Sequence, residues 1–175
     1  MVKIIRREIP INELRALLRF DEEGNLWWKI PKMGRRKNRP AGCYGKHGYK
    51  QIMINGEIFL AHRVIFALYY GFWPNEQIDH INGNKGDNRI ENLREASHSQ
   101  NNHNRPNYRN NTTGFKGVHT RKDYNKFLAR IRINGVAIHL GVFDTAEEAS
   151  AAYRQAAIKY HKDYAAVIVP GDMGK

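Results

Sequence analysis

Residues 78–105 read IDHINGNKGDNRIENLREASHSQNNHNR, and this stretch decides how the first half of the chain folds. Asp79 and His80 close a short segment with the pattern of a strand, and a polar, turn-rich loop follows it. Ser97 and Gln100 have the spacing of a capping box, so we expect a helix to begin directly after Ser97. The stretch therefore predicts a pair of short strands joined by a loop and followed by a helix.

Three side chains of this stretch could act on a phosphate through one hard cation. Asp79 offers a charged oxygen and Asn101 a neutral amide oxygen, and oxygen ligands suit Mg²⁺. His80 follows Asp79 on a strand, so the two side chains point to opposite sides, and a neutral imidazole can serve as a base. Taken alone, the Asp-His pair is weak evidence and favours a surface turn with a hydrogen-bonded histidine.

The composition points to a polyanionic partner. The 175 residues include 29 Lys and Arg against 17 Asp and Glu, a formal net charge of +12, and nucleic acid is the commonest polyanion. The excess is shared, with 18 basic and 11 acidic residues up to position 105 and 11 and 6 after it. A hydrophobic content of 41% supports folded cores and argues against general disorder.

Several protein classes are excluded by what the sequence lacks. No apolar run approaches a membrane span, and the N-terminus has no long apolar stretch of the kind found in signal peptides. The single cysteine, Cys43, excludes an internal disulfide and a zinc site built from paired thiolates. We expect an intracellular protein with neither a membrane nor a small-molecule substrate as partner.

Local patterns in the first half predict a helix capped by Asn12, a hairpin and a second helix. Asn55-Gly56 suits a two-residue hairpin turn between residues 51–54 and 57–60. The second helix, about 61–70, should bury Val64, Ile65, Leu68 and Tyr69 and end at Gly71. Before the hairpin, the basic run 31–50 fits a solvated loop as well as a phosphate-contacting segment.

Motifs around Asp79 resemble the HNH endonuclease family, and more narrowly the phage HNH homing endonucleases. The resemblance covers most of residues 12–105. The matching residues are Ala61-His62-Arg63, Trp73-Pro74, Ile78-Asp79-His80-Ile81-Asn82-Gly83-Asn84, Asp87-Asn88-Arg89, Asn92-Leu93-Arg94 and Gln100-Asn101-x-x-Asn104-Arg105.

This resemblance implies a ββα-metal fold in which Asp79 is a metal ligand, His80 is the general base and Asn92 braces the loop that orients His80. Asn101 falls at the third motif position, where many relatives carry histidine, and its spacing from Asn92 selects it as the second ligand. His98 is the alternative ligand. For the His-Arg pair at 62–63, packing with a phosphate contact is as good an interpretation as catalysis.

The second half predicts a three-stranded antiparallel sheet packed on one helix. Residues 126–133 alternate, and Asn134-Gly135 suits a turn. Thr145 and Glu148 have the spacing of a capping box. The expected buried strand residues are Phe127, Ala129, Ile131, Ile133, Val136, Ile138 and Leu140, and the expected helix stripe is Ala149, Ala152, Tyr153, Ala156 and Tyr160.

Residues 114–165 resemble the AP2 DNA-binding domain. The matching residues are Phe115-Lys-Gly-Val118, Lys126-Phe-x-Ala-x-Ile-Arg132, Leu140-Gly-x-Phe-Asp-Thr145, Glu147-Glu-Ala149 and Ala152-Tyr153. In that family a sheet enters the major groove and a helix supports it from behind. The resemblance implies that the outward face contacts DNA through His119, Arg121, Lys126, Arg130, Arg132 and His139.

Together these patterns predict an α+β chain that cuts double-stranded DNA. The expected domains are an HNH nuclease domain over 1–105, a polar linker over 106–113, an AP2-like domain over 114–169 and a tail over 170–175. The expected cofactor is one Mg²⁺, which Mn²⁺ can replace, and the expected product is a nick made by a monomer. The family resemblance places it in the cytoplasm of a bacterial host, encoded by a phage. The alternatives are a non-catalytic sequence-specific DNA-binding regulator and a basic RNA-binding protein.

Overall fold

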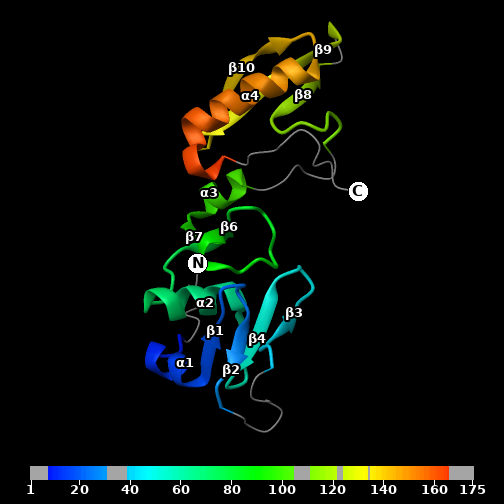
Figure 1. Ribbon diagram of the computed structural model, residues 1–175. Coiled ribbons are helices and arrows are strands. Elements are labelled where there is room, and N and C mark those ends of the chain that lie inside the picture. Colours follow the sequence, from blue (N-terminus) through cyan, green and yellow to red (C-terminus); the bar gives the residue numbers. More distant parts are fainter. Residues whose placement is uncertain (1–7, 31–38, 105–110, 122–123, 134, 166–175) are drawn as a thin grey trace. The chain divides into compact units, whose positions relative to one another are not determined.

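The computed structural model describes residues 8–30, 39–104, 111–121, 124–133 and 135–165, and its chain forms two compact units (Figure 1). These units are Met1–Ala96 and Ser97–Lys175. Both mix helices with small antiparallel sheets, as the α+β prediction requires. The predicted domain limits stay a prediction, and most of the predicted linker and the whole tail lie outside the described residues.

Three small antiparallel sheets and two α-helices make up the described part of the first unit. Sheet one pairs β1 with β2, sheet two has the order β3-β4-β5, and sheet three pairs β6 with β7. The elements are α1 (Ile11–Leu17), β1 (Leu18–Phe20), β2 (Leu26–Trp28), β3 (Cys43–Tyr44), β4 (Lys50–Ile54), β5 (Glu57–Leu60), α2 (Ala61–Tyr70), β6 (Gln77–His80), the 3-10 turn η1 (Ile90–Asn92) and β7 (Leu93–Ala96).

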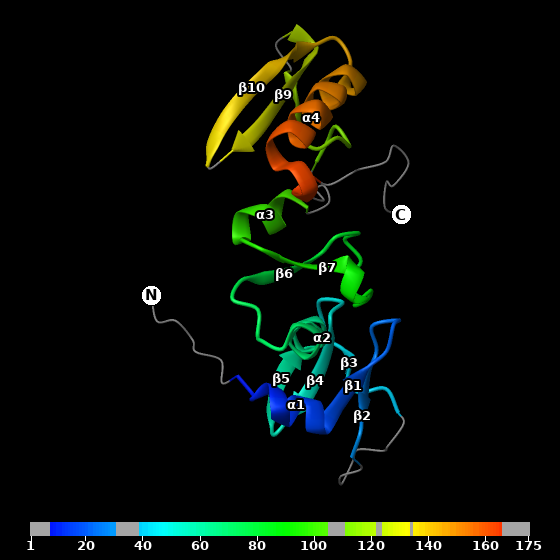
Figure 2. The same ribbon diagram turned by 60° about the vertical axis from the view of Figure 1, so that its left-hand side comes forward.

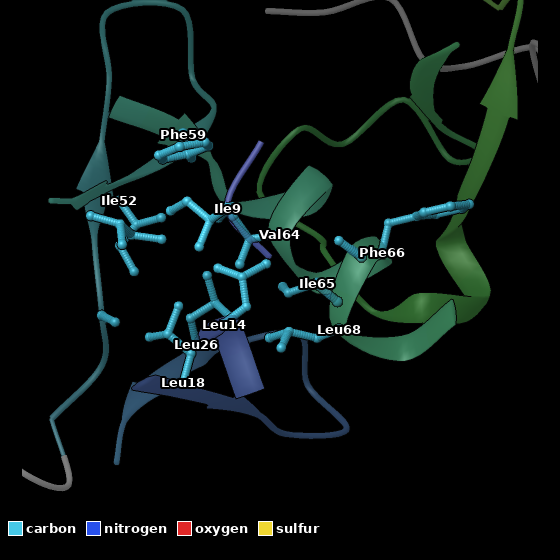
Figure 3. Close-up of a cluster of buried hydrophobic side chains, with 14 of the residues drawn as sticks. Ile9, Leu14, Leu18, Leu26, Ile52, Phe59, Val64, Ile65, Phe66 and Leu68 are labelled. Carbon is cyan, nitrogen blue, oxygen red and sulfur yellow. The ribbon is translucent and has the colours of Figure 1, made fainter. Parts of the chain in front are cut away.

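The core of the first unit gathers aliphatic side chains from α1, the first two sheets and α2 (Figure 3). Leu14 on α1, Ile54 on β4 and Ile65 on α2 are each 0% exposed, so these elements meet on their apolar faces. The β4–β5 hairpin turns at Asn55 and Gly56, whose φ values of 51° and 85° confirm the predicted turn. Gly71 ends α2 in the left-handed conformation, also as predicted.

Two predictions about the helices of this unit are wrong. Asn12 does not cap α1, because the helix starts one residue earlier, at Ile11, after Pro10. Tyr69 is 54% exposed because the buried face of α2 runs from its start to Leu68 and leaves the last two residues at the surface.

The second unit contains a short helix, a three-stranded sheet and a long helix that lies along one face of the sheet (Figure 2). The sheet has the order β10-β9-β8 and is antiparallel, which confirms the predicted sheet on one helix. Its elements are α3 (His98–His103), β8 (Val118–Arg121), β9 (Lys126–Ile133), β10 (Val136–Phe143), α4 (Ala146–His161) and the 3-10 turn η3 (Lys162–Tyr164).

Both predicted capping boxes are present. Ser97 accepts a hydrogen bond from the backbone of Gln100 at the start of α3, and Thr145 accepts one from Glu148 at the start of α4. In each box the side chain at the third helical position bonds back to the backbone of the capping residue. The sequence pattern was sufficient here because every partner lies within three residues.

Small side chains let α4 lie close to the sheet. Ala149 is buried in one cluster with Ala129 of β9. Ala156 and Ala157 are buried in a second cluster with Ile131 of β9. Close approach is most marked at Gly117, where an added Cβ would lie 2.1 Å from the ring of Tyr153. The helix therefore packs on the face of β9 that the alternation predicted.

Three residues of the predicted buried set are exposed. Val136 and Ile138 are 64% and 37% exposed because β10 is an edge strand and both lie near its start. Leu140 packs against the core as predicted, although a bulge shifts the register of β10 between His139 and Gly141. Tyr160 is 43% exposed, and His161 is buried at the end of α4.

Candidate active site

The antiparallel pairing of β6 with β7 places Asp79 opposite Arg94 and His80 opposite Leu93. Asp79 and His80 are each only 5% exposed. Their side chains have different partners, as expected for neighbours on a strand: Asp79 contacts Arg94, and His80 contacts Asn88. The two predicted groups thus sit next to each other in sequence but in different hydrogen-bonding environments.

The Asp79 carboxylate forms an ion pair with Arg94. Both Nε and Nη2 of Arg94 donate to the same oxygen, Oδ2, at 2.9 and 2.7 Å. A buried carboxylate needs a positive partner or strong hydrogen bonds, and here a guanidinium supplies both. Arg94 lies within a matching motif, but the sequence alone assigns it no role.

His80 is held by an amide side chain of the following loop. Its Nε2 lies 3.0 Å from Oδ1 of Asn88, whose side chain is fully buried. An amide oxygen can only accept, so this contact is a hydrogen bond in the tautomer that carries the imidazole proton on Nε2, whose basic lone pair lies on Nδ1. Burial lowers the pKa of His80 below 6.5, and the contact with Asn88 and the charge of Asp79 offset part of that shift. The ring is therefore neutral at cellular pH, as a general base must be.

Two aromatic rings enclose the His80 imidazole. The ring of His62, on α2, lies edge-on to it with centroids 5.0 Å apart, and Tyr49 lies 5.9 Å away. Burial lowers the pKa of His62 to about 3, and the Nδ1 atom of His62 has no hydrogen-bond partner among the described residues. The ammonium of Lys85 lies over the ring of Tyr49, 4.8 Å from its centre.

Asn92 ties down the loop between His80 and β7. Its Oδ1 accepts from the backbone N–H of Asn82, and its Nδ2 donates to Oδ1 of Asn82 and to the backbone carbonyl of Asp87. Asn82 also donates to the Asp87 carboxylate, which pairs with Arg89. The hydrogen bond to Arg89 lowers the pKa of Asp87 far below its usual range. These contacts hold the loop that carries Asn88, and the site role that the resemblance implies for Asn92 stays a prediction.

The loop is also supported from a turn that is distant in sequence. Gly24 has φ +75°, and a Cβ added there would lie 2.3 Å from the backbone carbon of Asn88. Only a residue without a side chain permits this approach. Nothing in the sequence around Gly24 signals this contact with Asn88.

Arg63 has a structural role in this unit. Its two terminal nitrogens donate to the backbone carbonyls of Glu76 and Pro74, each at 2.8 Å. These bonds fix the segment that leads from α2 into β6. For His62 and Arg63 the sequence left two interpretations open, packing with a phosphate contact or catalysis, and these contacts support packing.

The predicted second ligand, Asn101, and its alternative, His98, lie on α3 and belong to the second unit. Their roles stay predictions. Among the described residues, no group of three or more His, Cys, Asp or Glu side chains could hold a metal ion. A site that uses one carboxylate, an amide, water and phosphate oxygens would not form such a group.

The stretch that carries Asp79 and His80 is similar to a known protein family. Residues 59–103 match the family model described as HNH endonuclease. The match spans α2, β6, the loop, β7 and α3, and it supports the likeness to HNH endonucleases that the motifs predicted there. One similar solved structure is titled "DNA binding and cleavage by the HNH homing endonuclease I-HmuI"; it is 17% identical, with a TM-score of 0.42, over 87% of this chain and 90% of that one. A search of the curated proteins gives no match. None of the described helices has both the length and the apolar character needed to cross a bilayer.

The second candidate surface is the face of the β8–β10 sheet opposite α4. The strand register places all six predicted DNA-contacting residues on this face: His119, Arg121, Lys126, Arg130, Arg132 and His139. Arg130 is opposite His139 and donates through Nε to Nε2 of His119 at 3.0 Å. Lys126 forms an ion pair with Asp144, and Arg121 stacks over Tyr124. The structure thus shows a basic sheet face, while contact with DNA stays a prediction.

Proposed function

We propose that this protein is a DNA endonuclease of the homing type, which hydrolyses a phosphodiester bond with one divalent cation and nicks one strand. The observation that carries the proposal is a buried, neutral His80 beside the carboxylate of Asp79, within the residues that match the HNH endonuclease model. Both groups are buried with specific partners. His80 combines burial with a lowered pKa, which is typical of functional sites.

In this proposal His80 accepts a proton from the attacking water. Asn88 fixes the tautomer by accepting from Nε2, so the Nδ1 lone pair takes the proton. Asn92 keeps the loop that carries Asn88 in place. Attack on phosphorus with release of the 3′-oxygen leaves a 5′-phosphate and a 3′-hydroxyl end.

The residues present fit a hard cation such as Mg²⁺ or Mn²⁺. Asp79 supplies a carboxylate oxygen, and Mg²⁺ usually takes only one or two carboxylates and completes its shell with water and phosphate. The sequence pattern proposes Asn101 as the second ligand, with His98 as the alternative. When bound, the cation would stabilise negative charge on the phosphate during hydrolysis.

The second unit would position the DNA. We propose that residues 114–169 form an AP2-like domain whose basic face binds duplex DNA. Arg130 supports this proposal most directly, because its bond to His119 orients a guanidinium on an exposed sheet face. The nuclease part would comprise residues 1–105, joined to the AP2-like domain by residues 106–113, in a monomeric, phage-encoded protein.

Nicking of supercoiled plasmid tests the proposal. The full chain should convert supercoiled plasmid to the open-circular form with Mg²⁺ or Mn²⁺, and EDTA should stop the reaction. An Asp79→Asn variant serves as the control for a contaminating nuclease. Tight duplex binding with no nicking in either metal would favour the alternative, a non-catalytic DNA-binding regulator. Preference for RNA over duplex DNA would favour the third interpretation.

A further inference from the structure

Arg94 occupies the carboxylate that the proposed function assigns to a cation. The two residues are cross-strand partners, and two N–H groups of Arg94 bond a single oxygen of Asp79. Their side chains are only 16% and 6% exposed. The charge of Asp79 is therefore already balanced within its own unit.

This ion pair opposes cation binding. A divalent cation that reached Asp79 would lie within a few ångströms of the guanidinium, and repulsion between like charges is weakly screened where water is scarce. Turning Arg94 away without a new partner is also unfavourable, because a mostly buried guanidinium would lose its counter-charge. Cation binding to the protein alone should thus be weak.

A phosphate group would remove this obstacle. The guanidinium fork binds phosphate as well as carboxylate, through two parallel N–H bonds. Arg94 could exchange the carboxylate for a DNA phosphate and keep its charge balanced. Asp79 would then be available to a cation only when DNA is present.

We propose that Arg94 couples cation binding to DNA binding: it holds Asp79 in the free protein and transfers to a backbone phosphate in the complex. The inference rests on the proposed function, since it takes Asp79 as the cation ligand. Thermodynamic linkage makes the coupling reciprocal, so DNA raises cation affinity and the cation raises DNA affinity by the same factor. The protein would carry its cation mainly where a phosphodiester is bound.

The test measures Mn²⁺ binding rather than cleavage. Electron paramagnetic resonance reports free Mn²⁺ during titration of the full-length His80→Ala protein, in which the duplex stays intact. The same titration of an Asp79→Asn, His80→Ala protein subtracts the Mn²⁺ that binds to DNA itself. We expect a short duplex to raise the Asp79-dependent Mn²⁺ affinity by at least about tenfold.

Arg94→Gln in the same background should separate the two events. This change removes the charge and keeps a hydrogen-bonding side chain, so Mn²⁺ should bind at least about tenfold more tightly without DNA, and the duplex should add less than about threefold. Arg19→Gln is the matched control. It removes one arginine from the same unit, where the guanidinium stacks over Trp27, and should leave both affinities as in the parent.

The outcomes distinguish this inference from the proposed function. If the His80→Ala protein shows Asp79-dependent Mn²⁺ binding that the duplex does not change, the proposed coupling is wrong while the cation site stands. If Arg94→Gln binds Mn²⁺ no more tightly than Arg19→Gln, Arg94 is not the coupling residue. If no Asp79-dependent binding occurs even with duplex, the cation site of the proposed function fails and the coupling fails with it. Even if Arg94→Gln does not fold, comparing Mn²⁺ binding to the His80→Ala protein with and without duplex decides whether cation and DNA binding are coupled.

Discussion

Replacing Gly24 with alanine tests whether the distant turn positions the candidate base. The backbone of Gly24 has φ +75°, which costs an L-residue about 1 to 2 kcal/mol. The new Cβ would also lie 2.3 Å from the carbon and 2.6 Å from the oxygen of the Asn88 backbone, and relieving such overlap costs about 1 to 3 kcal/mol. We therefore expect Gly24→Ala to lower the free energy of unfolding by about 2 to 5 kcal/mol.

Gly56→Ala provides the matched control. Gly56 has φ +85° in the β4–β5 turn, and an added Cβ there meets nothing within 4 Å. Only the conformational cost applies, so Gly56→Ala should lose about 1 to 2 kcal/mol. Urea denaturation of both variants gives the difference, which isolates the contact with Asn88.

The nicking rate gives a second readout of the same contact. Displacing Asn88 moves the acceptor that fixes the His80 tautomer, so Gly24→Ala should slow nicking even at temperatures where the protein stays folded. Gly56→Ala should leave the rate unchanged. Equal losses of stability in the two variants would refute the argument that Gly24 supports the loop.

Three further predictions concern acid stability, the helix–sheet contact and the basic face. Because burial depresses the pKa of His62 to about 3 in the folded protein, the unfolded chain alone binds that proton below pH 6.5. The free energy of unfolding should therefore fall by about 1.4 kcal/mol per pH unit from pH 6.5 towards 3, and His62→Phe should reduce that slope in denaturation curves. Gly117→Ala should destabilise the second unit by at least about 2 kcal/mol, because its Cβ would overlap the ring of Tyr153. Gly135→Ala is the control: its Cβ meets nothing within 4 Å, so it should lose only the conformational cost of a positive φ. A similar loss of stability in both variants would contradict the packing argument. If Arg130 reads a base edge, Arg130→Ala should weaken binding to the target duplex by about 1 to 3 kcal/mol. If Arg130 contacts phosphate, the variant should bind all duplexes more weakly by a similar factor, and the salt slope of the affinity should fall by about one. Unchanged affinity at every salt concentration would show that the sheet does not bind DNA.

The sequence could predict those features that depend on near neighbours. Both capping boxes, the Asn55-Gly56 turn and the alternation of β9 were predicted because each rests on residues a few positions apart. Two-residue periodicity and hairpin register placed Lys126, Arg130, Arg132 and His139 on one face. The resemblance to the AP2 domain added His119 and Arg121.

Features that depend on long-range packing could not be predicted. The bulge between His139 and Gly141 interrupts the pairing of β10 with β9 without a local signal. Tyr69 and Tyr160 fit helical stripes, but where each helix leaves its partner surface decides their exposure. The contact of Gly24 with Asn88 joins residues 64 positions apart.

The resemblance named Asp79, His80 and Asn92, because it transfers residues that lie in the motif, and their roles stay predictions. It did not name the residues that support them. Arg94 was unassigned because only the β6–β7 register shows that it faces Asp79. Tyr49 comes from outside the motif, and only the fold brings its ring to His80.

The most direct test of the central claim is the nicking rate of His80→Ala compared with its affinity for duplex DNA. Proton transfer by a positioned base contributes about 10² to 10⁴ in rate, so nicking should fall by at least about a hundredfold. Affinity should stay within about threefold of the wild type, since His80 is buried and its role is chemical. His47→Ala, which removes an exposed histidine of the same unit, should nick normally. Nicking by His80→Ala within about tenfold of the wild type would contradict the assignment of His80 as the general base.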